Sequence, residues 1–401
     1  MSDLPRSRVS LRRRPNTQTE RVGHRPPQLE ARRHQRGRRF ALIVSSSLLG
    51  IFTSGCVGVL DEADRREGAF ADPVAWSWLP SVVQGGDPHG ATPAVDSGRL
   101  RFSPGSFFYA DLRGAPLSAD SPALVSHLTR SVTGRYNGVA ALNVHDYNVG
   151  FYTAAPGTPR STVRFDDCQN KGWFDPQLAR AFADVPIPGG AVAAAGSDQN
   201  LSVYDPASDT LWEFWRAQRT SLGWTACFGG RLDSVSTSPG YFPGGLGASA
   251  TGISMAGGMI SLADMKRGYI DHALYLAVPD VRRWSAYSWP AQRSDGWSDD
   301  PSSLLEGSRL RLDARVNVDS LSLTPLGRMV AKAAQTYGFV VSDRAGAVAV
   351  ITESGAATAA ANGGVDPWVS LLDLNSKPSY TQLAGFPWER MQVVAKDWGK
   401  P

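Results

Sequence analysis

The sequence of 401 residues predicts a mainly β fold, arranged as one large β-sandwich or jelly roll with a few helices. Two observations favour this class. Short runs of alternating apolar and polar residues recur along the chain, separated by segments rich in its 41 glycines and 27 prolines. Long amphipathic runs are few, which is typical of a sandwich rather than a helical fold. A β-propeller is the alternative, because a single hairpin also forms half of a propeller blade.

The clearest strands form a hairpin over residues 201–215. An extended run over residues 201–204 is followed by the turn sequence DPASD and by a second extended run over residues 210–215. Asp205, which precedes a proline, is a typical turn residue. Alternation in the second run predicts that Glu213 and Trp215 share one face of the strand and that Trp212 lies on the other.

The best-defined helix is predicted over residues 325–337. Thr324 provides an N-cap, Pro325 suits the first helical position, and Gly338 follows the last turn. Weaker helical patterns occupy residues 121–132 and 261–269. Helices are therefore expected to be a minor part of the domain.

Three segments divide the chain. Residues 1–55 are predicted to be a lipoprotein-type signal segment, residues 56–120 a tether with loosely patterned first strands, and residues 121–395 the β-rich globular domain. An apolar run ends just before Cys56; it is shorter than the roughly 20 residues that span a bilayer, and arginines crowd the segment in front of it. This arrangement resembles a bacterial lipoprotein signal, in which a lipid on Cys56 anchors an extracytoplasmic protein to the cell membrane.

Two features of the signal segment leave alternatives open. Thr53 stands where leucine is usual in a lipoprotein signal, so an ordinary cleaved signal is the alternative. The run RGRRFALIV is similar to a twin-arginine signal, so both the general and the twin-arginine export routes remain open.

The charge balance argues against a nucleic-acid partner. The full chain has 41 basic and 37 acidic residues, a net charge of +4. Residues 1–55 contain 12 arginines and three acids, a net charge of +9, so the rest of the chain has a net charge of −5. No basic stripe with interleaved aromatic residues follows, and no nucleic-acid partner is expected.

Cys168 and Cys227 are predicted to form a disulfide. With Cys56 lipidated, they are the remaining pair among three cysteines, and an exported protein meets an oxidising compartment. Closing this loop would stabilise the fold by roughly 3–4 kcal/mol. Two buried free thiols are the alternative. Neither cysteine lies in a CxxC motif, and no metal site or cofactor is predicted.

Tryptophan points to carbohydrate as a ligand. The chain has 12 tryptophans, and aromatic faces pack well against the apolar faces of sugar rings. The candidate ligand-binding residues are Trp212, Trp215, Trp289, Trp297 and Arg293. About half of the tryptophans are expected to serve core packing instead.

Glu213 is the first candidate for a catalytic residue, because the run LWEFW surrounds it with large apolar side chains. Burial would raise its pKa and suit it to act as a general acid. Glycoside hydrolysis needs a second carboxylate, for which Asp198, Asp271 and Asp295 are candidates. His272 is a candidate base. Alternation along a strand points Asp271 and His272 to opposite faces, so they are not expected to form a dyad.

The runs GSDQNLSVYDPASDTLWEFWRA, YIDHALYLAVP and EGSRLRLDARVNVDSLSLTPLGRMVAKAAQTYGFVVSDRAG carry a resemblance over about residues 130–395. In these runs the chain resembles a group of exported bacterial proteins common in actinobacteria. The resemblance implies export and a single folding unit. It implies no activity, cofactor or site residue.

These observations together predict a surface-anchored lipoprotein that acts on polysaccharide, with a glycoside hydrolase favoured. The alternative is a non-catalytic lipoprotein that binds polysaccharide or cell-envelope glycan through a tryptophan-lined face. Geometry distinguishes the two, because a hydrolase needs Glu213 within about 5–10 Å of another carboxylate in a cleft.

Overall fold

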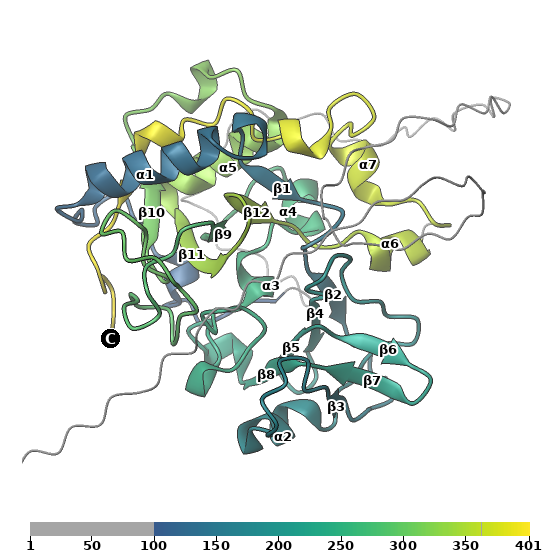
Figure 1. The fold of residues 1–401 in the computed structure, drawn as a ribbon. Helices are drawn as coiled ribbons and strands as arrows, with labels where there is room; N and C mark the ends of the chain where they lie inside the picture. Colours follow the sequence, from purple (N-terminus) through teal and green to yellow (C-terminus); the bar gives the residue numbers. More distant parts are fainter. Residues whose placement is uncertain (1–99, 362) are drawn as a thin grey trace, which may run out of the picture. The chain divides into compact units, whose positions relative to one another are not determined.

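The computed structural model describes residues 100–361 and 363–401 (Figure 1). The predicted signal segment, Cys56 and most of the tether lie outside the described residues. Three sheets of six, four and three strands are flanked by seven α-helices in this part of the chain. The helices are α1 (Ser121–Thr133), α2 (Pro176–Phe182), α3 (Met255–Gly258), α4 (Leu262–Arg267), α5 (Pro325–Thr336), α6 (Ala356–Ala361) and α7 (Pro367–Leu371).

The predicted β-rich character is confirmed in part. The described residues contain about as much helix as strand, so the sequence patterns underestimated the helical content. The unequal sheets also do not repeat as the four-stranded blades of a propeller do.

The largest sheet mixes parallel and antiparallel pairs in the order β1-β12-β9-β11-β10-β13. Every residue of β9 is buried, because the two faces of this strand meet different cores. Leu274 and Leu276 join the core shared with α1 and α5, whereas Tyr275 and Ala277 pack near α3. The strands are β1 (Ala141–Asn143), β9 (Leu274–Val278), β10 (Arg309–Leu312), β11 (Phe339–Arg344), β12 (Ala349–Ile351) and β13 (Met391–Val393).

The four-stranded sheet, in the order β2-β4-β5-β8, contains the predicted hairpin. Leu201 pairs with Phe214 and Asp205 with Thr210, which confirms both the strands and the turn. Neither face of β5 is open to solvent, however, because its first five residues are all buried. The strands are β2 (Gly150–Thr153), β4 (Leu201–Asp205), β5 (Thr210–Trp215) and β8 (Phe228–Asp233).

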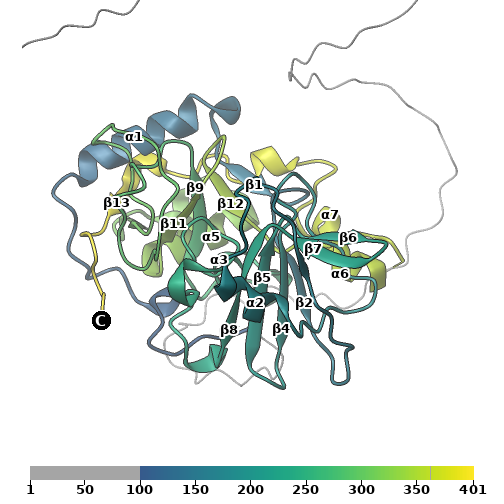
Figure 2. The same ribbon diagram turned by 60° about the horizontal axis from the view of Figure 1, so that its bottom comes forward.

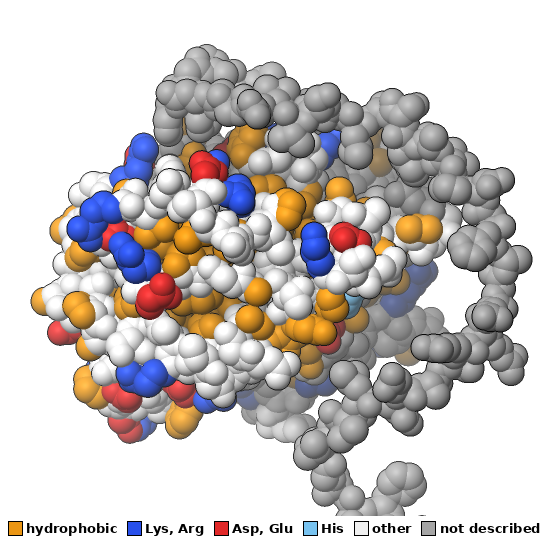
Figure 3. Space-filling model, turned by 90° about the horizontal axis from the view of Figure 1, so that it is seen from above, with side chains coloured by type: hydrophobic (Ala, Val, Ile, Leu, Met, Phe, Trp, Pro, Cys, Tyr) orange, Lys and Arg blue, Asp and Glu red, His pale blue; other side chains and the backbone are white. Residues whose placement is uncertain are grey.

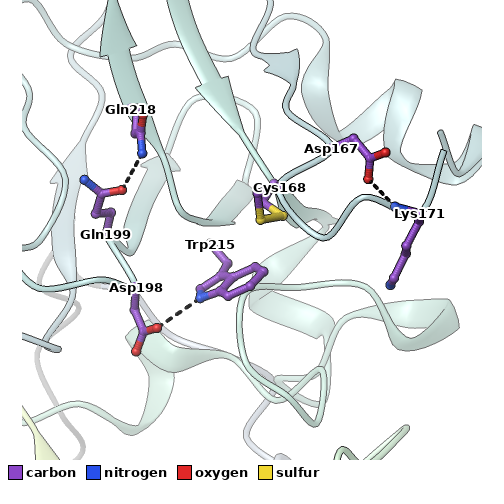
Figure 4. Close-up of a disulfide and its surroundings, with 8 residues drawn as sticks. Asp167, Cys168, Lys171, Asp198, Gln199, Trp215 and Gln218 are labelled. Atoms are coloured by element: carbon purple, nitrogen blue, oxygen red, sulfur yellow. Dashed lines mark hydrogen bonds between the residues drawn. A yellow bond between two sulfur atoms is a disulfide. The ribbon is translucent and has the colours of Figure 1, made fainter. Parts of the chain in front are cut away.

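A small third sheet carries the disulfide. It consists of β3 (Arg164–Phe165), β7 (Gly223–Ala226) and β6 (Gln218–Thr220). Cys168, which follows β3, is bonded to Cys227, which lies between β7 and β8 (Figure 4). The predicted disulfide is therefore confirmed, and it ties the third sheet to the second.

Replacing both Cys168 and Cys227 by alanine is expected to lower the free energy of unfolding by about 3–4 kcal/mol. The cross-link joins residues 59 apart in sequence, so it removes much of the conformational freedom of the unfolded chain. Urea denaturation of the full chain measures the loss, with Cys56→Ala as the matched control. A double variant as stable as the control would contradict this contribution.

Helix α5 forms as predicted, with the Thr324 hydroxyl accepting a hydrogen bond from the Gly327 amide. Gly338 follows the helix at a φ of 75°, which favours glycine over other residues. The weaker patterns also form helices, α1 and α4. Phe107 and Phe108 are buried in the core of the four-stranded sheet, so the folded domain already includes residues ahead of position 121.

Helix α3 lies between the six-stranded and the four-stranded sheet in both views of the fold (Figures 1 and 2). Its N-terminal end meets β5, and its body contacts β9. This short helix also lines a cavity between the two sheets, which is described below. None of the helices in the described residues is long and apolar enough to cross a membrane.

Candidate functional site

Glu213 lies in the interior of the protein and connects β5 to α3. Its Oε1 accepts hydrogen bonds from the Ser254 hydroxyl at 2.8 Å and the Ala256 amide at 2.9 Å, and its Oε2 accepts one from the Met255 amide at 3.1 Å. Burial raises the pKa of Glu213 to about 7, although these donors oppose the shift. The side chain is completely shielded from solvent, so in this structure its oxygens hold the start of α3 and cannot touch a substrate.

The four candidate tryptophans are separated by the fold. Trp212 is fully buried, and Trp289 packs edge-on against Phe107. Trp215 is partly buried and donates its indole N–H to Asp198 at 3.2 Å (Figure 4). Only Trp297, with 56% of its surface exposed, is open to a ligand among these four. They do not form one tryptophan-lined face.

A segment that we call the aromatic loop, residues 281–298, presents the exposed aromatic side chains near Trp297. Trp284 is 63% exposed, and Tyr287 is exposed as well. Backbone hydrogen bonds hold the two arms of the loop together, from the Trp284 amide to the Gly296 carbonyl and from the Trp297 amide to the Val281 carbonyl. This loop holds two of the three exposed tryptophans among the described residues and therefore fits the predicted aromatic platform.

Asp271 and His272 precede β9 rather than lying within it, because that strand begins at Leu274. Asp271 forms ion pairs with Arg101 at 2.7 Å and with Arg267 at 3.2 Å. His272 is buried, with Nδ1 3.0 Å from the Ala273 carbonyl and Nε2 3.4 Å from Asp264. The two candidates do not form a dyad, as the sequence predicted; His272 pairs with Asp264 instead.

Asp264 is locked at the start of α4. It forms a capping box with Ser261 and also accepts a hydrogen bond from Arg267. Burial alone would raise the pKa of Asp264, but His272 and Ser261 outweigh burial and lower it to about 2. The carboxylate is therefore ionised, and its partners hold it in place.

A cavity of about 550 Å³ opens beside these residues, and we call it the inter-sheet cavity. It lies among β2, α3, the start of α4 and the start of α6. Its larger side chains are aromatic or aliphatic, whereas a carboxyl, an imidazole and hydroxyl groups supply polar contacts. Lining residues include Leu100, Phe102, Tyr109, Phe151, Tyr152, Thr153, Met259, Ser261, Leu262, His272, Glu353 and Thr358.

Glu353 is the carboxyl group of this lining. Its Oε2 accepts a hydrogen bond from the Leu262 amide at 2.9 Å. Burial raises the pKa of Glu353 to about 7, and the nearby charge of Asp264 adds to the shift. Sequence analysis missed this residue, because a single acid after the apolar run AVAVIT gives no local sign that β2 and α4 lie beside it.

Asp295, a predicted catalytic residue, belongs to a different group. Carboxylate oxygens of Asp295, Glu306 and Asp343 all lie within 4.8 Å of one another, and we call these three residues the acidic cluster. Arg293, a predicted ligand-binding residue, is engaged nearby: it donates to the Ser249 carbonyl at 2.8 Å and lies over the ring of Phe228. Sequence analysis did not connect Asp295 with the other two acids.

A second hollow of about 730 Å³ runs along α1. It is lined by Leu117, Pro122, Val125, Thr129, Glu389 and Met391, among others. In the view from above, hydrophobic side chains appear in patches between scattered charged groups (Figure 3). Among the described residues that line it, the one carboxyl group, that of Glu389, is exposed and no histidine is present, so this hollow offers less chemistry than the inter-sheet cavity.

No protein-family model, curated protein or solved structure matches this chain. Only the chemistry of the described residues therefore points to a function.

Proposed function

We propose that this protein is an exported, membrane-anchored lipoprotein that binds a carbohydrate in the inter-sheet cavity. The observation that carries the proposal is the combination of four aromatic side chains with one half-buried carboxyl group around a single cavity. The disulfide supports an extracytoplasmic location, since such bonds persist in oxidising compartments. The signal segment supports export, and Cys56 supplies the position for a lipid anchor.

The walls of the cavity suit a sugar ring. Phe102, Tyr109, Phe151 and Tyr152 supply aromatic faces for the C–H side of a ring. The Tyr152 hydroxyl both donates to and accepts from the backbone of Val192, which fixes the orientation of that ring. Hydroxyl groups of the ligand have Glu353 and the lining hydroxyls as hydrogen-bond partners. The volume lies within the range of about 300–1,000 Å³ typical of small-ligand sites.

The geometry favours binding over hydrolysis. Hydrolysis of a glycosidic bond normally uses two carboxyl groups on opposite sides of the bond. Glu353 is the only carboxyl group among the described residues that line this cavity. The ring nitrogens of His272 face the Ala273 carbonyl and Asp264. Asp264 is in turn enclosed by the capping box at the start of α4.

A glycoside hydrolase is the second candidate, and the pKa of Glu353 is the observation that favours it. A carboxyl with a pKa of about 7 is matched to the working pH of a general acid, which donates its proton to the leaving oxygen. Reducing-sugar release from a polysaccharide panel, lost in Glu353→Gln, would support this candidate.

Phe151→Ala is expected to weaken binding of the preferred glycan about tenfold, because it removes one aromatic wall of the cavity. Glu353→Gln, which keeps the shape of the side chain, is expected to weaken binding as well. Affinities are measured by titrating the full chain with oligosaccharides chosen from a glycan panel. Trp284→Ala is the matched control, because it removes an exposed aromatic side chain outside the cavity lining.

Two outcomes would overturn the cavity as the binding site. If Trp284→Ala abolishes binding while both cavity variants keep it, the aromatic loop is the glycan-binding surface. If the wild-type chain binds none of the glycans, the carbohydrate proposal fails.

A further inference from the structure

The acidic cluster joins three segments that are distant in sequence. Asp295 comes from the aromatic loop, Glu306 from the residues before β10, and Asp343 from β11, near its end. Gly307 permits the close approach, because its φ is 81° and a Cβ there would lie 1.7 Å from the Ser288 carbonyl oxygen. The close approach of these backbone segments therefore brings the three carboxylates together.

Glu306 leaves one buried oxygen without a hydrogen-bond partner. The side chain is fully buried, and its Oε2 accepts a hydrogen bond from the Asp295 amide at 3.0 Å. Oε1 has no partner among the described residues. The Ser294 hydroxyl lies near enough to oppose the shift in the pKa of Glu306, but it makes no hydrogen bond of normal geometry with Oε1. A buried acceptor in this state is costly unless something else binds it.

Asp343 is held firmly but keeps its capacity to bind a cation. Its Oδ2 accepts hydrogen bonds from the Tyr275 hydroxyl at 2.8 Å and the Ala250 amide at 3.2 Å, and its Oδ1 accepts one from the Arg344 amide. A carboxylate has about four lone-pair sites, so these three hydrogen bonds orient Asp343 and leave one site, on Oδ1, for a cation. Asp295 is exposed and gives solvent access to the cluster.

The positive charges nearby do not neutralise the cluster fully. Arg293 directs its Nη2 to the Ser249 carbonyl, and Arg344 lies 3.5 Å from Asp295 in an ion pair at the surface. Neither guanidinium donates a hydrogen bond to Glu306 or Asp343 among the described residues. Burial raises the pKa of Glu306 to about 8 and that of Asp343 to about 6, and the charge of Asp295 raises both.

We propose that Asp295, Glu306 and Asp343 bind a calcium ion that fastens the aromatic loop to the end of β11. Calcium takes oxygen ligands at roughly 2.3–2.6 Å, so two of its ligands lie up to about 5 Å apart. The spread of the cluster oxygens, within 4.8 Å, agrees with this size. Carboxylates without histidine or cysteine favour calcium or magnesium over zinc. The site is independent of the inter-sheet cavity.

The first experiment is thermal unfolding of the full chain after treatment with EDTA, followed by titration with calcium. The unfolding temperature is expected to rise by about 5 °C when calcium reaches a hundredfold excess over its dissociation constant. Glu306→Gln and Asp295→Asn are expected to lose most of this rise. Asp299→Asn is the matched control, because it removes an exposed acid of the same region outside the cluster, and it is expected to respond like wild type.

If Glu306→Gln fails to fold, a direct measurement of calcium binding to Asp295→Asn still tests the site. This variant is expected to fold, because Asp295 is exposed. Isothermal titration with calcium at pH 7 is expected to show saturable binding by wild type and clearly weaker binding by Asp295→Asn, which lacks one of the three carboxylates. No saturable calcium binding by wild type, or equal binding by wild type and Asp295→Asn, would overturn the site. A larger response to magnesium than to calcium would overturn the choice of ion.

Discussion

Glu213→Ala is expected to destabilise the fold by about 4 kcal/mol or more, the largest effect of a single substitution considered. The substitution leaves the Ser254 hydroxyl and the amides of Met255 and Ala256 without their acceptor inside the protein. It also opens a void between β5 and α3. Urea denaturation of the full chain measures the loss.

Two further variants separate hydrogen bonding from other effects. Glu213→Gln keeps the shape and one acceptor oxygen but presents an NH₂ group to a donor, so its loss is expected to lie between those of wild type and Glu213→Ala. Glu389→Ala, at an exposed position, is expected to stay within about 0.5 kcal/mol of wild type. A loss below about 1 kcal/mol in Glu213→Ala would contradict the structural role of this carboxyl.

Glu213 and Glu353 alone are expected to make the fold more stable at pH 5 than at pH 8, by about 5 kcal/mol, when calcium is removed with a chelator. Glu306 and Asp343, whose pKa values are also raised, add to this difference. Burial raises the pKa of Glu213 and of Glu353 to about 7, above the ordinary value of 4.5. Between these values the folded chain keeps a proton that the unfolded chain releases, so stability falls as pH rises through this window. Each of the two groups contributes about 2–3 kcal/mol over this range.

Acids with a lowered pKa make the stability of the fold depend on pH in the opposite direction. Asp264 and Asp313 have pKa values of about 2, so the stability that they contribute is lost only as pH falls below about 4. Stability is therefore expected to reach its maximum near pH 4–5. Urea midpoints measured from pH 4 to pH 8 test this, and Glu353→Gln should show a smaller slope. A flat profile, or one rising between pH 5 and pH 8, would show that these carboxyls are not protonated in the folded state.

Local patterns predicted the elements that are encoded by neighbouring residues. The hairpin formed because its two strands and its turn lie within residues 201–215, and α5 formed because Thr324 and Pro325 define its start. The disulfide followed from counting cysteines. None of these predictions required knowledge of which distant segments come together.

The candidate site could not be predicted in the same way. The apolar residues around Glu213 made it a candidate whose pKa burial would raise, but the donors that occupy its oxygens come from residues 254–256. Glu353 lines the inter-sheet cavity together with Phe151 and His272, which lie far from it in the sequence. A local pattern reports burial, whereas a site also depends on what fills the space beside the buried group.

By itself the sequence determined the hairpin, the cap of α5 and the cysteine pair, and it supplied the prediction of an exported, lipid-anchored protein. Only the tertiary structure decided that Asp295 meets Glu306 and Asp343, that His272 pairs with Asp264, and that Glu353 faces a cavity. The physical reason is one of range. Propensities, caps and turns act between residues a few positions apart, whereas carboxyl pKa values, cavities and ion sites depend on segments that meet only after the chain has folded.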